Sequence, residues 1–214
     1  MSGSIDFKKR DKAFYMPPAT PHLIEVPRMR FLMVDGAGDP NTAPAYQEAM
    51  EALYTISYAI KMSKMANAQP EGYFEYVVPP LEGLWQTDGP LYDDHGQMNK
   101  AAFRWTSMIR QPDFVTEAVL STAKAASLKK KPALDTSRVR LEEWTEGLCV
   151  QMMHLGAYDD EIATVRRMDE FAAVAGCELD FSDVRRHHEI YLSDPRKTAS
   201  EKLKTVLRHP VVKR

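Results

Sequence analysis

Two stretches decide the fold: Met33–Asp39, which reads MVDGAGD, and Met153–Asp160, which reads MHLGAYDD. Each stretch leaves a short apolar run through a Gly-Ala pair and enters an acidic segment. An apolar run that stops at glycine predicts a buried strand and a turn, and acidic residues are typical of the first turn of a helix. The sequence therefore predicts the same passage from strand to helix twice.

The segments that follow these two stretches extend the repeat. Apolar residues at helical spacing predict one helix over about 42–65 and another over about 159–175. A strand with a single glutamate then follows in each half, Glu82 in PLEGLW and Glu189 in HHEIYL. The distance from turn glycine to glutamate is 82 − 36 = 46 residues in the first half and 189 − 156 = 33 in the second. A strand-helix-strand-strand unit used twice accounts for this order.

Other local patterns predict the remaining elements. The run AAFRWTSMI is expected to pair with the PLEGLW strand, and a helix is expected over about 112–130. VRLEEWT and LCVQMMHLG are expected to form a β-hairpin around Glu146 and Gly147, and TASEKLKTVLRHP is expected to be a short helix. The prolines Pro17, Pro18 and Pro21 and the lack of periodicity predict an extended arm over residues 1–20 with little chemistry.

These elements together predict an α+β fold. Two repeats, about 21–110 and 111–214, would place their strands in an antiparallel sheet with helices on one face. The other face would form a central ligand groove. The arm of residues 1–20 would lie outside this domain.

Composition limits the classes of function. The 214 residues are 44% hydrophobic and 27% charged, as in ordinary folded proteins. Lys plus Arg is 28 and Asp plus Glu is 30, so the net charge of −2 gives no basic field for nucleic acid. No apolar run is long enough to span a membrane, and no secretory signal is visible, so the expected location is the cytoplasm. Cys149 and Cys177 are expected to be small buried hydrophobic residues.

Glu189 is the leading candidate for chemistry. Strand alternation predicts that Ile190 and Leu192 face the helices, while Glu189 and Tyr191 face the groove. A carboxylate desolvated among aromatic rings has a raised pKa and can act as a general base or as the counter-ion of a cationic ligand. The alternative is that Glu189 simply pairs with a neighbouring arginine, Arg185 or Arg186.

Glu82 is the second candidate carboxylate. With Trp85 three residues further on, it could define the opposite wall of the groove; the alternative is an exposed glutamate in a turn. Aromatic and methionine side chains could line a flat pocket for a planar ligand, although each could equally belong to the core. These candidates are Tyr54, Tyr58, Trp85, Trp105, Trp144, Met152 and Tyr191.

The sequence supports neither a metal site nor a cofactor. His187 and His188 are adjacent in an expected strand, so they point to opposite faces and cannot share a metal ion easily. No fingerprint of a serine hydrolase, a zinc protease or a nucleotide-binding loop occurs. No metal and no cofactor are therefore expected.

Four blocks carry a family resemblance: PLEGLW, FRWTSMIRQPDFVT, EGLCVQMMHLGAYDDE and HHEIYLSDPRKTASEKLKTVLRHPV. From about Pro21 to the C-terminus the sequence resembles the stand-alone GyrI-like small-molecule-binding proteins. The resemblance implies a pseudo-twofold pair of strand-helix-strand-strand units around a central pocket. In related drug-sensing regulators a pocket glutamate meets cationic aromatic drugs, and Glu189 falls on the matching strand. This sequence has no appended basic helix-turn-helix domain, so direct DNA binding is not expected.

The PLEGLW and HHEIYLSD blocks are also similar to those of a hydrolase subgroup of this family. Its members open the cyclopropane of cyclopropanoid DNA-alkylating natural products. The resemblance implies Glu189 as the general base and Glu82 as a second carboxylate, with exchangeable roles, and Trp85 and Tyr191 as stacking residues. The expected partner is therefore an aromatic small molecule. A non-catalytic protein that binds or senses drugs, and a protein that acts through a protein partner, remain alternatives.

Overall fold

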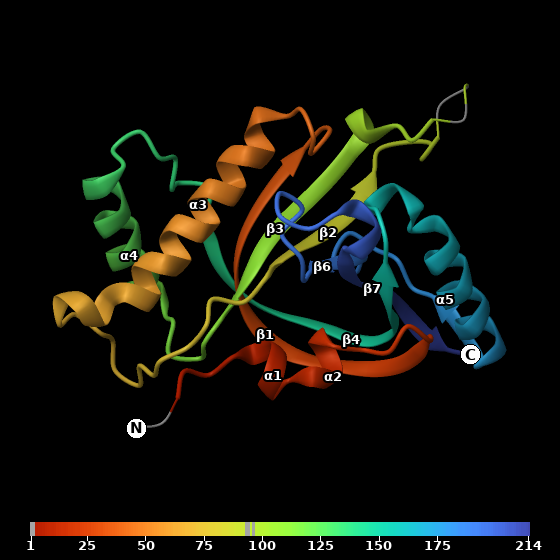
Figure 1. The fold of residues 1–214 in the computed structure, drawn as a ribbon, viewed down its shortest axis with the longest axis horizontal. Helices are drawn as coiled ribbons and strands as arrows, with labels where there is room; N and C mark the ends of the chain where they lie inside the picture. Colours follow the sequence, from red (N-terminus) through yellow and green to blue (C-terminus); the bar gives the residue numbers. More distant parts are fainter. Residues whose placement is uncertain (1–2, 93–94, 96) are drawn as a thin grey trace. The chain divides into compact units, whose positions relative to one another are not determined.

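The computed structural model describes residues 3–92, 95 and 97–214 of the chain (Figure 1). These residues form two compact units, and the chain passes between the units several times rather than once near residue 110. Unit 1 comprises Met1–Asp6, Met29–Pro79 and Trp85–Glu143, and unit 2 comprises Phe7–Arg28, Pro80–Leu84 and Trp144–Arg214.

Unit 1 is built on the pairing of β1 (His22–Ala37) with β3 (Phe103–Gln111). The two strands are antiparallel, from Arg30 opposite Gln111 to Ala37 opposite Arg104. The helix α3 (Pro44–Lys61) packs against β3 and against α4 (Glu117–Lys130), as Figure 1 shows. Short 3-10 turns, η1 (Met62–Ala66) and η2 (Lys100–Ala102), follow α3 and precede β3.

Unit 2 is organised around the strand β7 (Lys204–Lys213). It pairs antiparallel with β4 (Arg140–Leu155), β6 (His187–Tyr191) and β5 (Cys177–Leu179). The helix α5 (Ile162–Val174) packs on β5 and β7. The smaller elements are α1 (Phe7–Arg10), α2 (Lys12–Tyr15), η3 (Tyr158–Asp160) and η4 (Ser200–Lys202).

The strands follow the hydrogen-bonded order β4-β1-β3-β2-β6-β7-β5, in which β2 is Leu81–Thr87. β4 also pairs with β7, so six strands form a barrel-like sheet and β5 extends it. Together with the helices, this confirms the predicted α+β class. The predicted pairing of the AAFRWTSMI and PLEGLW strands is also confirmed, because β3 and β2 are neighbours.

The stretches Met33–Asp39 and Met153–Asp160 both contain a turn at a glycine. After β1 and after β4, a glycine in the left-handed region turns the chain, Gly38 with φ 100° and Gly156 with φ 139°. The N–H of Gly38 donates to the carbonyl of Phe103 (2.8 Å), and that of Gly156 donates to Leu203 (3.1 Å). Each turn is therefore fastened to the start of the strand that pairs with the strand it leaves.

In unit 2, a cluster of buried hydrophobic side chains fills the core beneath the helix α5. Val150, Met152, Met168, Ala172, Cys177, Leu207 and Val211 are all buried there. Cys149 and Cys177 are free, and both are buried, as predicted.

The predicted hairpin around Gly147 is wrong, because β4 runs continuously from Arg140 to Leu155. Gly147 has φ 75°, which an L-residue with a side chain adopts only under strain, so the glycine permits a local irregularity within the strand. The guanidinium of Arg185 donates to the carbonyls on both sides, Glu146 (3.1 Å) and Leu148 (2.7 Å). These bonds give a hydrogen-bond donor to the carbonyl on each side of Gly147.

The predicted C-terminal helix is wrong as well. Residues 205–211 are all buried, because β7 is covered on both faces and paired on both edges. A strand of this kind has no polar face, so its apolar residues do not alternate and can imitate helical spacing. Two further expectations need smaller corrections: α4 begins at Glu117 rather than Pro112, and YFEYVV forms only an isolated bridge, at Tyr76.

The arm expected over residues 1–20 contains α1 and α2, whose Phe7 and Tyr15 are buried.

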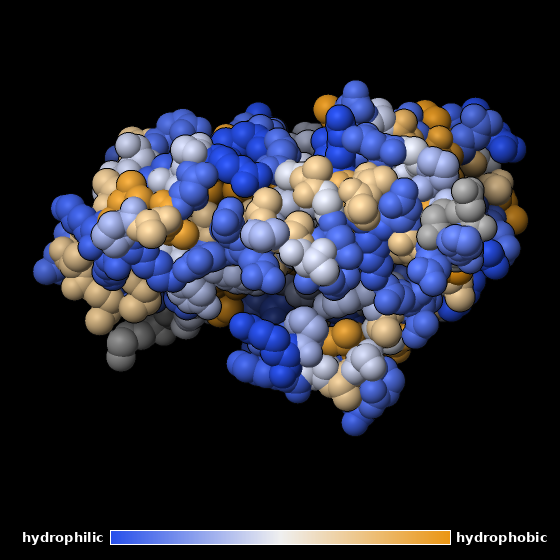
Figure 2. Space-filling model, turned by 90° about the horizontal axis from the view of Figure 1, so that it is seen from above, coloured by the Kyte–Doolittle hydropathy of each residue, from blue (hydrophilic) through white to orange (hydrophobic). Residues whose placement is uncertain are grey.

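On the face shown in Figure 2, hydrophobic residues occur in small groups among hydrophilic ones. Within the described ranges, no helix has both the length and the apolar character that a membrane crossing requires.

Candidate functional site

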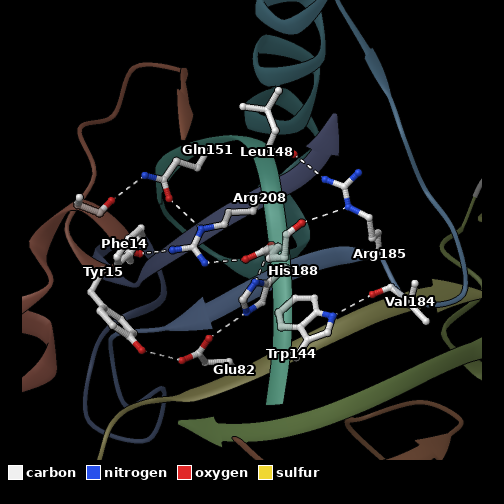
Figure 3. A network of polar contacts seen from close by, with 12 residues as sticks. Phe14, Tyr15, Glu82, Trp144, Leu148, Gln151, Val184, Arg185, His188 and Arg208 are labelled. Atoms are coloured by element: carbon white, nitrogen blue, oxygen red, sulfur yellow. Dashed lines mark hydrogen bonds and ion pairs between the residues drawn. The ribbon is translucent and has the colours of Figure 1, made fainter. Parts of the chain in front are cut away.

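Unit 2 contains a buried polar network centred on His188 of β6 (Figure 3). The Nδ1 of His188 lies 2.9 Å from Glu146 Oε1, and its Nε2 lies 3.0 Å from Glu82 Oε2. A carboxylate only accepts hydrogen bonds, so both ring nitrogens must carry a proton and His188 is an imidazolium. We call Tyr15, Glu82, Glu146, His188 and Arg208 the His188 network.

The charges of the His188 network balance. Arg208 Nη1 donates to Glu146 Oε2 at 2.9 Å, so two cations face two carboxylates, each with a side chain no more than 3% exposed. Burial alone raises the pKa of Glu146, but His188 and Arg208 outweigh burial and hold it at about 2. Burial alone lowers the pKa of His188, but Glu146 and Glu82 raise it to about 9. Glu146 and His188 are thus both ionised at neutral pH.

The N-terminal segment completes the His188 network. The Tyr15 hydroxyl donates to Glu82 Oε1 at 3.1 Å, and Arg208 donates to the Phe14 carbonyl. Gln151 bridges the two sides, because its Oε1 accepts from Arg208 (2.8 Å) and its Nε2 donates to the Ala13 carbonyl (2.7 Å). The expectation that residues 1–20 carry little chemistry is therefore wrong.

A second polar cluster lies on the other face of β6. Glu189 has a side chain 14% exposed, and its Oε1 lies 3.2 Å from the Nε2 of His187. Glu161, at the start of α5, is 9% exposed, and its Oε1 has no hydrogen-bond partner among the described residues. We call Glu161, His187 and Glu189 the Glu189 cluster.

Electrostatics distinguish the members of this cluster. Burial, and after it the negative charge of Glu189, raises the pKa of Glu161 well above its ordinary value. Glu161 therefore holds its proton more tightly than an exposed glutamate does. Burial, followed by the charge of Glu189, also raises the pKa of Tyr158 to about 12. The ring of Tyr158 contacts that of Tyr191 edge to face, with centroids 5.6 Å apart.

The predicted facing of β6 is wrong. Glu189 is opposite Leu207 in β7, and residues paired across antiparallel strands point to the same side. Leu207 packs with Met168 and Ala172 of α5, so Glu189 lies on the helix-covered face. Tyr191 lies with it, against Tyr158. The alternation itself is confirmed, because His187 and His188 belong to different clusters.

The two candidate glutamates have different surroundings. Glu82 is not an exposed turn residue, since it is 2% exposed and both of its oxygens have partners. Glu189 contacts His187, while Arg185 pairs with Asp180 and Arg186 Nε donates to the Asp183 carbonyl. The catalytic roles of both glutamates stay predictions.

The predicted ligand-contacting side chains differ in their burial and in their neighbours. Met152 (1% exposed) packs in the unit 2 core, and the Trp105 ring (1% exposed) lies 5.0 Å from that of Tyr46 between centroids. Both are buried as core residues, and their predicted pocket role stays a prediction. The Trp105 ring occupies the space that a side chain at Gly36 would need. Tyr54 is exposed. Trp85 contacts Tyr46 and Phe103, Trp144 contacts His188, and Tyr58 is exposed.

Among the described residues, one group of three metal-type side chains has ligand atoms within 4.8 Å of one another, and it is the Glu189 cluster. The contact between His187 and Glu189 uses one of these atoms from each residue in a hydrogen bond. Because His187 and Glu189 are hydrogen-bonded to each other in this structure, we describe the group as a hydrogen-bonding cluster.

Sequence reasoning missed most partners of the two glutamates. Glu161 belongs to the acidic segment Tyr158–Glu161, which also fits an ordinary helix start. Glu146 and Arg208 were missed because each was assigned to the wrong element, a hairpin turn and a helix. Only strand register brings His188 and Arg208 together, since they are directly opposite in β6 and β7.

Comparison with known families gives a match over residues 19–212 to the GyrI-like small-molecule-binding domain. The chain belongs to the GyrI-like family. Two similar structures come from Listeria innocua. One is called a hydrolase and has 51% identity and a TM-score of 0.89; the other is called an uncharacterized conserved protein and has 53% identity and a TM-score of 0.91. Each comparison covers 98% of this chain and 100% of the other.

A more distant structure shares the fold. The EcmrR C-terminal domain has 12% identity and a TM-score of 0.53, with 91% of this chain and 98% of that domain covered. No curated protein matches the sequence. The GyrI-like assignment thus rests on the family match and on the two similar structures.

Proposed function

We propose that this GyrI-like protein binds flat, aromatic or amphipathic small molecules and hydrolyses the cyclopropane of cyclopropanoid DNA-alkylating natural products. The observation that carries the proposal is the pair Glu161 and Glu189 in unit 2. One carboxyl group is buried with a raised pKa, and the other is partly exposed beside tyrosines. Such a pair supplies an acid and a base at one place.

The proposed reaction adds one water across a strained bond. Glu189 accepts a proton from water as the water oxygen bonds to the ring methylene and the cyclopropane carbon–carbon bond breaks. The electron pair of that bond moves through the conjugated dienone to its oxygen, which becomes a phenolate. Glu161 donates a proton to this oxygen, and its raised pKa suits that role.

Glu161 replaces Glu82 as the second carboxylate in this proposal. Glu82 is 2% exposed and bonded to Tyr15 and His188, whereas Glu189 is partly exposed, so Glu161 beside Glu189 is the carboxyl group that the proposal uses. Tyr191 is the proposed stacking residue in unit 2. Trp85 and Tyr54 belong to unit 1, and their ligand contacts stay predictions outside the proposed site of unit 2.

The 51% identity to a chain called a hydrolase supports the enzymatic proposal. A non-catalytic drug-binding protein is the alternative, because a partly exposed carboxylate beside Tyr158 and Tyr191 also suits an aromatic cation. The two functions differ in whether the ligand changes chemically.

Mass spectrometry of a cyclopropanoid drug incubated with the purified protein tests the proposal. The expected result is a product heavier by one water, formed with turnover by the native protein and by Glu201→Gln, a variant at an exposed glutamate. Glu189→Gln and Glu161→Gln should lose turnover while still quenching tryptophan fluorescence on ligand binding. Saturable quenching with unchanged drug would reject hydrolysis of that substrate and favour the binding protein.

A further inference from the structure

A chain of hydrogen bonds leads away from Glu189 across unit 2. His187 Nε2 lies 3.2 Å from Glu189 Oε1, and His187 Nδ1 lies 2.7 Å from His209 Nε2. His209 Nδ1 lies 2.7 Å from Asp169 Oδ1 of α5. The strands β6 and β7 and the helix α5 thus align two carboxyl groups and two imidazoles in one row.

The three hydrogen bonds of the row require one proton more than two neutral imidazoles and two carboxylates supply. It has three contacts, between Glu189 and His187, between the two histidines, and between His209 and Asp169, and each needs one proton. Two neutral imidazoles provide only two. The third proton must reside on one of the four side chains.

The surroundings decide which end of the row holds this third proton. His209 has a side chain 6% exposed, and burial lowers its pKa, which disfavours a second proton on this ring. A neutral His209 donates from Nδ1 to Asp169 and accepts at Nε2 from His187 Nδ1. The remaining proton then lies between His187 Nε2 and Glu189 Oε1.

We propose that His187 and His209 form a proton relay that keeps one proton beside Glu189 and connects Glu189 with Asp169. With this proton on His187 Nε2, an entering proton stays on Glu189. The Nδ1–H bond of His187 then breaks as an N–H bond forms at His209 Nε2, and the Nδ1–H bond of His209 breaks as Asp169 takes the proton. The Asp169 side chain is 32% exposed, so water can take this proton. Reverse transfer restores the original state of both rings. His187 and His209 are positioning residues, because they act through Glu189.

Several ionisable groups act on the Glu189 cluster at the inner end of the row. η3 and the start of α5 contribute Tyr158, Asp159 and Glu161, and Asp194 lies close enough to affect Tyr158. These groups are anionic or neutral, so they favour a proton on the Glu189 cluster. The His188 network does not compete for this proton, since His188 points to the opposite face of β6.

The relay has a role in turnover only if the proposed function holds, but its proton arrangement can be measured without a substrate. Long-range ¹H–¹⁵N NMR spectra of the full chain report which nitrogens of the six histidines carry protons. His187→Gln and His209→Gln assign the two signals. The expected result at neutral pH is a neutral His209 with its proton on Nδ1, and a His187 protonated on Nδ1. A proton on His209 Nε2, or a bare His187 Nδ1, would overturn the relay.

Removing the negative charge of Asp169, at the outer end of the row, gives a second test of the relay. Asp169→Asn keeps an oxygen acceptor for His209 but removes the negative charge that raises the pKa of His209, so the His209 signals should titrate at lower pH than in the native protein. Glu170→Gln, at an exposed neighbour on α5, should leave that titration unchanged. Equal titration in native protein and Asp169→Asn would reject coupling along the row. If the NMR results hold but no substrate is hydrolysed, the relay stands and the proposed hydrolysis fails.

Discussion

His187 and His188 are adjacent in the chain and yet bond to entirely different groups. His187 lies between Glu189 and His209, and His188 lies between Glu82 and Glu146. The alternation of side chains along β6 separates the rings onto two faces. The strand therefore carries a buried, charge-balanced network on one face and a cluster with a partly exposed carboxylate on the other.

Arg208 should be essential to the stability of unit 2. Arg208→Met removes a buried cation and leaves Glu146 with only His188 as counter-ion, so the free energy of unfolding should fall by about 3 kcal/mol or more. Arg214→Met removes a guanidinium that is 60% exposed and paired with Glu178, and should cost less than ~1 kcal/mol. Urea denaturation measures both values. Similar losses in the two variants would contradict the role assigned to the buried network.

The His188 network should confine maximal stability to mildly acidic pH. The lowered pKa of Glu146 stabilises the fold above its ordinary value of 4.5, and this contribution is lost as pH falls towards about 2. The raised pKa of His188 stabilises the fold fully below 6.5, and this contribution is lost as pH rises through about 9. The free energy of unfolding from these two groups should be highest between pH 4.5 and 6.5.

Urea denaturation at a series of pH values checks this profile. His188→Gln should abolish the alkaline decline that His188 causes. A native profile that stays level through pH 9 would show that His188 is not held as an imidazolium. Where the variant does not fold, the pH dependence of the His188 ring signals in native protein supplies the same information.

The hydroxyl of Tyr15 should stabilise the fold through Glu82. Tyr15→Phe deletes the 3.1 Å hydrogen bond to a buried carboxylate and should lower the free energy of unfolding by ~1–3 kcal/mol. Tyr58→Phe, at a side chain 49% exposed, should change it by less than ~0.5 kcal/mol. The test is again the shift of the urea midpoint, and equal midpoints would mean that the Tyr15 hydroxyl contributes nothing.

Gly147 should tolerate no side chain without a loss of stability. Gly147→Ala leaves ordinary contact distances, 3.7 Å to Arg185 and 3.9 Å to Glu25, but it places a Cβ at φ 75°. The expected cost is ~1–2 kcal/mol from backbone strain alone. Gly3→Ala has open space and no such φ, so its melting temperature should match that of the native protein. An unchanged melting temperature for Gly147→Ala would show that the strand relaxes freely.

The sequence was informative where one face of an element is polar. The helix α3 and the strand β6 follow ordinary periodicity, and the two Gly-Ala stretches predicted the repeated passage from strand to helix. β7 escaped prediction because burial on both faces removes the alternation. β4 was not predicted as one continuous strand, because a glycine inside a strand resembles a turn when only local sequence is considered.

The candidate site could be predicted only in part. Glu189 was recognised from one polar residue in an apolar strand, and its tyrosine neighbour Tyr191 from strand spacing. Glu161, His209 and Asp169 come from segments far away in the chain, and no local pattern relates them to Glu189. Their relation depends on the pairing of β6 with β7 and on the packing of α5.

The bond between Arg208 and the Phe14 carbonyl joins residues separated by 194 positions. A chain emerging from the ribosome cannot complete unit 2 until β7 has been synthesised, because Phe14 and Tyr15 otherwise lack the partners that β7 and β6 supply. High sequence separation between contacts slows folding. The newly made N-terminal segment must therefore wait for almost the entire chain, and a chaperone that shields it during synthesis would raise the yield of folded protein.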